Sequence, residues 1–129
     1  MIVLDASSAV CVLLDRPLDR ADRVRERLRG EDLHAPHLID LEVASALRRS
    51  VAAGELQAGR AEAALTTLAE FPLTRHPHHP LLNRIWRMRP NRTAYDAAYV
   101  ALAEALGAPL ITLDARMART PAAVAIEVF

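Results

Sequence analysis

Short apolar runs and helix-period repeats alternate along the chain. Ile2-Val3-Leu4 and Leu110-Ile111-Thr112 are continuous, mainly apolar runs, as expected for strands buried in a sheet. Between such runs, apolar residues return every three or four positions, as in Ile39, Val43 and Leu47, which indicates helices with one buried face. The pattern predicts strands at 2–4, 33–35, within 71–76, at 110–112 and at 125–128, and helices at about 8–14, 15–30, 38–54, 57–70, 79–88 and 93–106, with a helical turn over 114–119.

This alternation of strands and helices favours an α/β fold with a mostly parallel central sheet and helices on both faces. Ser7 or Ser8 is expected to cap the first helix, and Gly107 to end the helix at 93–106. The helices at 38–54 and 57–70 are expected to form an αα-hairpin. Because 129 residues leave little room for a second core, we expect residues 1–129 to form a single domain.

Composition narrows the class of protein. No apolar run approaches the ~20 residues that cross a bilayer, and Asp5 interrupts the start where a signal peptide is apolar, so we expect the cytoplasm as the location. Cys11 is the only cysteine, which excludes an internal disulfide and a cysteine-based zinc site. All 16 basic residues are arginines, which removes lysine nucleophiles and P-loop chemistry. They balance 16 acidic residues, so the whole molecule is not expected to attract nucleic acid.

Four acidic residues fall at the ends of predicted elements. Asp5 directly follows the strand at 2–4, and Asp114 follows the strand at 110–112 after one residue. Asp96 lies in the first turn of the helix at 93–106, and Glu42 lies near the start of the helix at 38–54. Ligands of open parallel sheets bind at the carboxyl ends of the strands, so we expect these side chains to meet at one edge. Gathered carboxylates favour a hard divalent cation such as Mg²⁺ or Mn²⁺, which supports phosphodiester hydrolysis by metal-activated water.

Each acid also has an ordinary explanation that the sequence leaves open. Asp96 completes a capping box with Thr93, and Asp114 is placed to cap the turn that follows it. Glu42 is a first-turn acid on a helix flank, and only Asp5 has no obvious partner nearby in the sequence. Phosphatases of the haloacid dehalogenase type and response-regulator receivers also have acidic α/β sites, but both need a lysine, which this chain lacks.

The acids stand in four short segments: Ile2-Val3-Leu4-Asp5-Ala6-Ser7-Ser8-Ala9, Pro36-His37-Leu38-Ile39-Asp40-Leu41-Glu42-Val43, Tyr95-Asp96-Ala97-Ala98-Tyr99-Val100-Ala101-Leu102-Ala103 and Leu110-Ile111-Thr112-Leu113-Asp114. In this order and at these separations, the segments resemble the PIN-domain nucleases, and more closely the VapC toxins of bacterial toxin-antitoxin pairs. The resemblance spans nearly the whole chain. It maps the family's metal-binding acids, and the hydroxyls beside the first and the last of them, onto Asp5, Glu42, Asp96, Asp114, Ser7 and Thr112.

The resemblance implies a three-layer α/β/α fold with residues 1–129 as a single PIN domain. It also implies endoribonuclease activity that depends on Mg²⁺, with Mn²⁺ as a substitute, a homodimer, and a cognate VapB-like antitoxin that blocks the site. A PIN domain of this size without further sequence favours the toxin branch of the family. The alternative is a non-catalytic module of the same fold that binds RNA or a partner protein and keeps the acids as helix caps.

One stretch of the chain is strongly basic. Between Phe71 and Tyr95 there is no acidic residue, and we expect this stretch to hold the RNA backbone. Trp86 or Tyr95 is available to stack on a base, although a core or dimer contact is the preferred interpretation for Trp86. A zinc site at the neighbouring histidines lacks a fourth ligand and is the less favoured interpretation. The residues concerned are Arg75, Arg84, Arg87, Arg89 and Arg92, of which the last four are the candidate RNA contacts, and His76, His78 and His79.

Overall fold

The computed structural model describes residues 1–129 and contains one sheet of five parallel strands. The strands are β1 (Ile2–Leu4), β2 (Leu33–Pro36), β3 (Leu73–His76), β4 (Leu110–Thr112) and β5 (Ile126–Val128), in the order β3-β2-β1-β4-β5. β1 is central: Ile2 pairs with Leu33 of β2, and Val3 pairs with Leu110 of β4. The strand order reverses between β1 and β4, and such a reversal opens a crevice at the carboxyl ends of the two strands.

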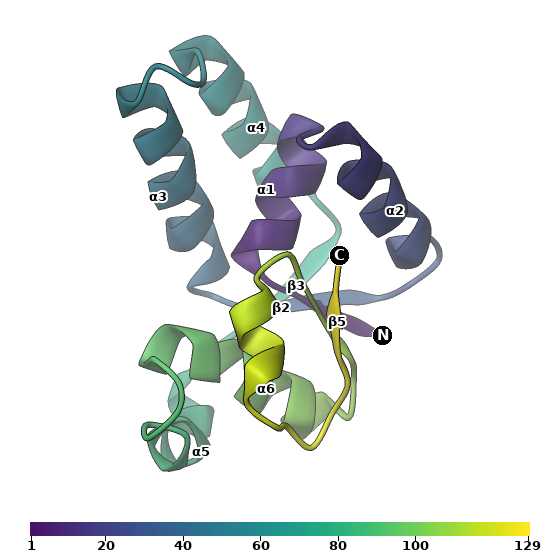
Figure 1. Cartoon of the computed structure of the whole chain (residues 1–129), viewed down its shortest axis with the longest axis vertical. Helices are drawn as coiled ribbons and strands as arrows, with labels where there is room; N and C mark the ends of the chain where they lie inside the picture. Colours follow the sequence, from purple (N-terminus) through teal and green to yellow (C-terminus); the bar gives the residue numbers. More distant parts are fainter.

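Helices cover both faces of the sheet (Figure 1). One face carries α1 (Ala6–Leu14), α2 (Leu18–Leu28) and the hairpin of α3 (Ile39–Ala52) and α4 (Ala58–Glu70). The other face carries α5 (Leu82–Arg87) and α6 (Ala94–Leu106), and α6 packs against β1, β2 and β4. Short 3₁₀ turns, η1 (His79–Leu81) and η2 (Ala115–Arg119), complete the chain. The expected three-layer α/β/α architecture is therefore confirmed.

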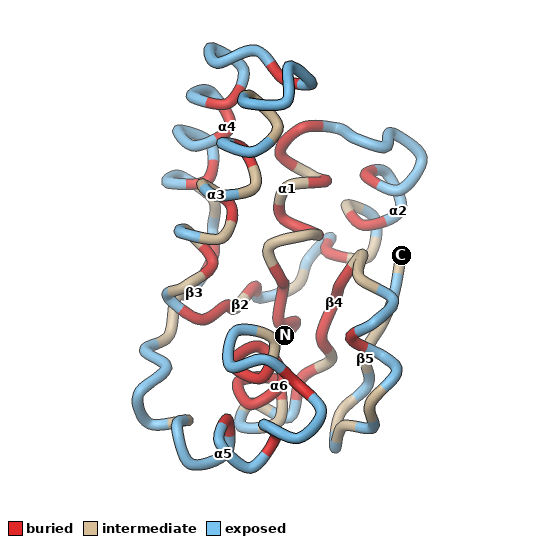
Figure 2. Tube along the Cα trace, turned by 60° about the vertical axis from the view of Figure 1, so that its left-hand side comes forward, coloured by how far each residue is buried: buried red, intermediate tan, exposed pale blue.

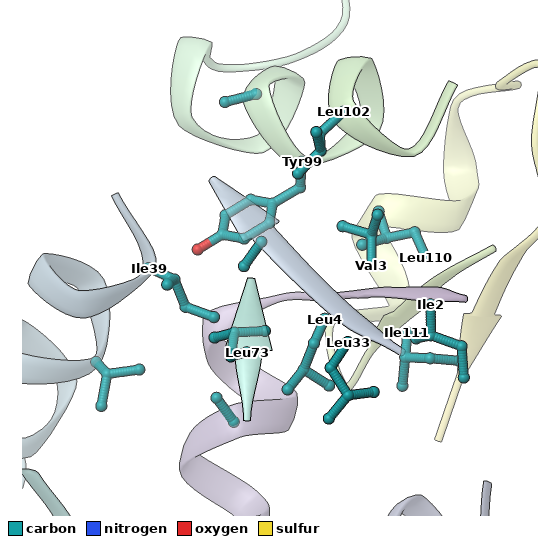
Figure 3. Close-up of a cluster of buried hydrophobic side chains, with 14 of the residues drawn as sticks. Ile2, Val3, Leu4, Leu33, Ile39, Leu73, Tyr99, Leu102, Leu110 and Ile111 are labelled. Carbon is teal, nitrogen blue, oxygen red and sulfur yellow. The ribbon is translucent and has the colours of Figure 1, made fainter. Parts of the chain in front are cut away.

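The core is one cluster of 31 buried residues around the sheet. Side chains alternate along each strand: Figure 3 shows Leu4 and Leu33 pointing to the α1 side, and Val3 to the α6 side. Figure 2 shows α6 as a largely buried helix, whereas much of α4 and α5 is exposed. Alanines such as Ala97 and Ala101 are almost completely buried on α6, and their small side chains let its backbone approach the sheet closely.

Every strand and helix that the pattern predicts is present, with bounds that shift by at most three residues; the segment predicted as a helix at 79–88 begins as the 3₁₀ turn η1 before α5. The capping residue of α1 is a correction. Asp5, not Ser7 or Ser8, occupies the N-cap position with an extended backbone, and its carboxylate accepts a hydrogen bond of 2.9 Å from the Ser8 backbone N–H. A carboxylate placed directly at the end of a strand therefore serves as a helix cap as well. None of the helices combines the length and the apolar surface that crossing a bilayer requires.

Trp86 does not join the core, so that part of the preferred interpretation is wrong. Its side chain lies on α5 and is 66% exposed, and the Arg89 guanidinium lies 4.7 Å from its ring centroid. The α5 helix is only six residues long and buries Ile85 instead. A role of Trp86 in a dimer contact stays a prediction.

The histidines of the basic stretch are not gathered at one point in the structure. The His76 Nε2 atom lies 2.9 Å from the His34 Nδ1 atom across β2 and β3, and no group of three His, Cys, Asp or Glu side chains is close enough to hold a metal. Burial, followed by the neighbouring His34 and His37, lowers the pKa of the half-buried His76.

We expect this histidine pair to make the fold less stable in acid. Because the pKa of His76 is lowered in the folded state, its contribution is complete above the ordinary histidine pKa of about 6.5 and is lost as the pH falls through the folded value. His76→Gln should therefore lose less unfolding free energy than the wild type between pH 7.5 and 5, by on the order of 0.5 kcal/mol. Urea unfolding at both pH values measures the difference, with the exposed His78→Gln as control. Equal losses in wild type and His76→Gln would contradict the expectation.

Candidate metal centre and active site

The four candidate acids line one open cleft of about 800 Å³. They come from four parts of the chain: Asp5 from the end of β1, Glu42 from α3, Asp96 from the first turn of α6, and Asp114 from the turn after β4. The cleft lies at the carboxyl ends of β1 and β4, where the strand order reverses. The fold thus brings together side chains that are more than 100 positions apart in sequence.

Asp5 is the most buried of the four acids, with 6% of its surface exposed. The Ser7 hydroxyl donates to its carboxylate at 2.7 Å, and the Thr112 hydroxyl of β4 donates to the other oxygen at 2.6 Å. The Leu113 backbone N–H in turn donates to Ser7 Oγ at 2.9 Å. Burial raises the pKa of Asp5, and the hydrogen bonds, that from Thr112 most of all, oppose this rise by stabilising the charged form.

Glu42 is held by a tyrosine from α6. The Tyr99 hydroxyl donates to a Glu42 carboxylate oxygen at 2.6 Å, and Figure 3 shows this hydroxyl pointing from α6 toward the start of α3 beside Ile39. Burial is the largest cause of a raised pKa at Glu42; the hydrogen bond from Tyr99 lowers the pKa, and the charges of Asp5 and Asp96 raise it further. Burial and this contact also raise the pKa of Tyr99 far above its ordinary range, so the phenol stays a donor.

Asp96 fulfils only half of the capping box. The Thr93 hydroxyl accepts a hydrogen bond of 3.1 Å from the Asp96 backbone N–H, as the pattern predicts. The Asp96 carboxylate makes no hydrogen bond or ion pair within the chain, and it lines the cleft. The capping interpretation therefore accounts for the backbone of Asp96 and leaves its charge unexplained.

Asp114 is both a cap and an ion-pair partner. Its carboxylate accepts from the Arg116 backbone N–H at 2.9 Å and so caps η2. The Arg116 guanidinium also contacts the same carboxylate, at 2.6 Å from Nη2 to Oδ2, and this contact is the largest cause of the lowered pKa of Asp114. Asp114 is thus the one acid of the cleft that an arginine neutralises directly.

The donor set of the cleft suits a hard divalent cation. It offers four carboxylates and no histidine, and carboxylate oxygens are the ligands that Mg²⁺ and Mn²⁺ prefer. No three of these carboxylates converge closely enough to form a ready-made metal site. The reason is visible at each residue: Asp5, Glu42 and Asp114 are turned toward Thr112, Tyr99 and Arg116. Cation binding at this cleft therefore requires side-chain movement, above all at Asp114.

The candidate RNA-binding arginines have different surroundings. Arg84 pairs with Glu104 at 2.6 Å, and Arg92 is buried and donates to the backbone carbonyls of Met117 and Thr120. Arg89 is exposed beside Trp86, and Arg87 is exposed without an acidic partner. The structure thus uses two of the four arginines to hold the fold and leaves two directed to solvent.

Sequence reasoning missed two residues of the cleft region. Tyr99 lies one helical turn after Asp96, so the spacing of three residues on a predicted helix was a usable signal that both face the same side. Arg116 lies two residues after Asp114, and nothing in the local pattern marks it as the partner of that acid.

Comparisons with known proteins agree with this architecture. The sequence description of the PIN domain matches residues 2–123. The VapC ribonuclease Mb0985 of Mycobacterium bovis is 45% identical over 120 residues, which cover 93% of this chain and 91% of that protein. Ribonuclease VapC12 of Mycobacterium tuberculosis is 42% identical over 120 residues, which cover 93% and 92%.

Two solved structures share the fold. PAE2754 from Pyrobaculum aerophilum superposes with a TM-score of 0.71 at 24% identity, covering 97% of this chain and 88% of that chain. VapC20 of Mycobacterium tuberculosis, described as a sarcin-ricin loop cleaving toxin, superposes with a TM-score of 0.71 at 13% identity, covering 92% and 93%. The chain belongs to the PIN-domain family and, within it, to the VapC ribonucleases.

The burial of Asp5 predicts a gain in stability when its charge is removed. Because the pKa of Asp5 is raised in the folded state, its ionised form is disfavoured relative to the unfolded chain at neutral pH. In chelator, Asp5→Asn should raise the unfolding free energy and with it the melting temperature. Thermal melts at pH 7 measure this, with the exposed Asp32→Asn as control. A lower melting temperature for Asp5→Asn would mean that its hydrogen bonds outweigh the cost of burial.

Proposed function

We propose that this protein is an endoribonuclease toxin that cleaves RNA with the help of a divalent cation, Mg²⁺ or in its place Mn²⁺. The observation that carries the proposal is the gathering of four carboxylates on one cleft at the sheet crevice. The relatives that match most of the chain are named ribonucleases, which supports RNA as the substrate.

The proposal gives each residue of the cleft a role. Asp5, Glu42, Asp96 and Asp114 would hold the cation, which supplies activation of a water molecule and neutralisation of the phosphodiester charge. Ser7 and Thr112 fix both oxygens of Asp5 by hydrogen bonds, so this carboxylate keeps one orientation. Tyr99 does the same for one oxygen of Glu42. Burial raises the pKa of Glu42 most, and the charges of Asp5 and Asp96 raise it further; a bound cation would relieve this repulsion.

The alternative, a non-catalytic module that keeps the acids as caps, explains only half of the cleft. Asp5 and Asp114 do cap α1 and η2. The Glu42 and Asp96 side chains cap nothing, and both lie where their charges repel. Helix capping does not require these two acids to face the same cleft, whereas cation binding does.

The proposed binding partners and location rest on the similarity of this chain to VapC ribonucleases. We propose a homodimer, a VapB-like antitoxin that covers the cleft, and a cytoplasmic location, with residues 1–129 acting as a single PIN domain. Trp86, exposed on α5, is a candidate for a dimer contact as well as for an RNA contact. Size-exclusion chromatography of wild type and Trp86→Leu distinguishes the two roles, because only a dimer contact would change the elution volume when Trp86 is replaced.

The central prediction concerns cleavage and its dependence on the cation. Purified protein should cleave RNA in Mg²⁺ or Mn²⁺ and stop when chelator is added. Glu42→Gln and Asp96→Asn should each reduce cleavage by at least about 100-fold and lose most of the rise in melting temperature that Mg²⁺ gives the wild type. The exposed Glu62→Gln on α4 is the matched control. Cleavage that survives thorough chelation would contradict the proposal.

A second prediction isolates the Tyr99 hydroxyl. Tyr99→Phe keeps the buried ring and removes only the donor to Glu42, so the carboxylate loses its fixed orientation. We expect Mn²⁺ affinity to fall by about tenfold, the range in which partners of metal ligands act. Electron paramagnetic resonance of free Mn²⁺ measures the affinity without any cleavage assay. Tyr95→Phe, on the same helix and 65% exposed, should leave it unchanged.

A further inference from the structure

A second hollow of about 380 Å³ adjoins the acidic cleft on the side of α5, α6 and η2. It shares Asp96 and Met117 with the cleft, so the two openings lie side by side. The hollow is basic whereas the cleft is acidic: arginines are the most frequent residues of its lining, and Met117 is its one apolar residue. The lining residues are Arg89, Asn91, Arg92, Thr93, Asp96, Arg116 and Met117.

The three arginines of the hollow differ in how many groups of the protein already bind their guanidinium groups. Arg92 is buried and its guanidinium is committed to the carbonyls of Met117 and Thr120, which fixes η2 to the turn before α6. The Arg116 side chain is 74% exposed and contacts only Asp114, an acid that cation binding would draw away. Arg89 bonds a carbonyl of its own turn and has no acidic partner. Arg89 and Arg116 are therefore the two charges that a ligand of the hollow would meet.

A flat aromatic surface lies beside Arg89, which lines this hollow. The Arg89 guanidinium rests 4.7 Å from the centroid of the Trp86 ring, and Trp86 is 66% exposed. An arginine stacked on an exposed tryptophan offers a cation for a phosphate, and the face of the ring that the guanidinium does not cover is open to an unpaired base. An acidic protein segment would need the cation but not the ring, so the pair favours single-stranded nucleic acid.

The opposite rim of the acidic cleft also carries positive charge. Arg16 and Arg49 line the cleft on the side of α1 and α3. A phosphodiester strand is repelled by the carboxylates in the middle of the cleft and attracted at both rims. Because positive charge lies on both rims and negative charge lies between them, an RNA strand is expected to cross the cleft from one rim to the other, over the acids.

We infer that the hollow binds the phosphate next to the cleaved bond of a single RNA strand, with Arg116 and Arg89 as the phosphate ligands and Trp86 stacking on an unpaired base. This inference rests on the proposed function, whose substrate strand it orients. The RNA phosphate would compete with the Asp114 carboxylate for the exposed Arg116 guanidinium, and a cation that drew Asp114 away would strengthen this contact. The arginines at 16 and 49 hold the strand on the other side of the cut.

Binding of a fluorescein-labelled single-stranded RNA in chelator tests this, because binding is then measured without cleavage. Arg89→Gln and Arg116→Gln should each weaken binding several-fold and reduce the salt dependence, log Kd against log salt, by about 0.7. Trp86→Leu should weaken binding by about tenfold, and Trp86→Phe, which keeps an aromatic face, should recover most of it. Arg20→Gln, an exposed arginine of α2 that lines neither opening, is the matched control and should bind as the wild type. Melting temperatures and elution volumes identify any variant that fails to fold or to assemble.

The outcomes separate this inference from the function on which it rests. Wild-type protein that neither binds nor cleaves RNA would overturn the proposed function. Wild-type binding and cleavage, with Arg89→Gln and Arg116→Gln bound as tightly as Arg20→Gln, would overturn the inference and leave the function standing. Equal affinity for single-stranded and duplex RNA would remove the role of Trp86, because a paired base is not available for stacking.

Discussion

The carboxylate of Asp5 lies where β1 ends, α1 begins and β4 passes alongside, and each of these elements contributes a hydrogen bond to it or positions one. A buried carboxylate is tolerated only when its oxygens are bonded, and here the Ser8 N–H, the Ser7 hydroxyl and the Thr112 hydroxyl meet that need. The same contacts join the first strand to a segment 107 positions away and set the floor of the cleft. The arrangement of the cleft therefore depends on how this one side chain is held.

The remaining acids show how the fold tolerates like charges. Glu42 receives a phenol hydrogen bond, and Asp114 receives a guanidinium, whereas Asp96 has no partner within the chain. The result is a cleft in which burial and repulsion raise the pKa of Glu42 while an arginine lowers that of Asp114. Such unequal compensation is costly to the folded chain alone, and in the proposed function a cation and a phosphate would offset it.

Some arginines form ion pairs or hydrogen bonds that hold the fold, and others remain free to bind a ligand. Arg75 and Arg84 pair with Asp40 and Glu104, acids that lie 35 and 20 positions away in the sequence. Arg92 is buried against backbone carbonyls. A stretch that contains no acid of its own is thus partly neutralised by other elements, and Arg89, which has no acidic partner, lines the hollow beside the cleft.

The sequence by itself determined the elements, their order and the position of the acids at strand ends, because hydrophobic period, caps and turn residues are local signals. The parallel order then brought Asp5 and Asp114 to one edge by a general property of such sheets. Only the tertiary structure decided which side chains face each other: Tyr99 with Glu42, 57 positions apart, and Arg84 with Glu104. It also decided that Trp86 stays exposed on a helix too short to bury it. Contacts between distant elements depend on how faces pack, and no local pattern carries that information.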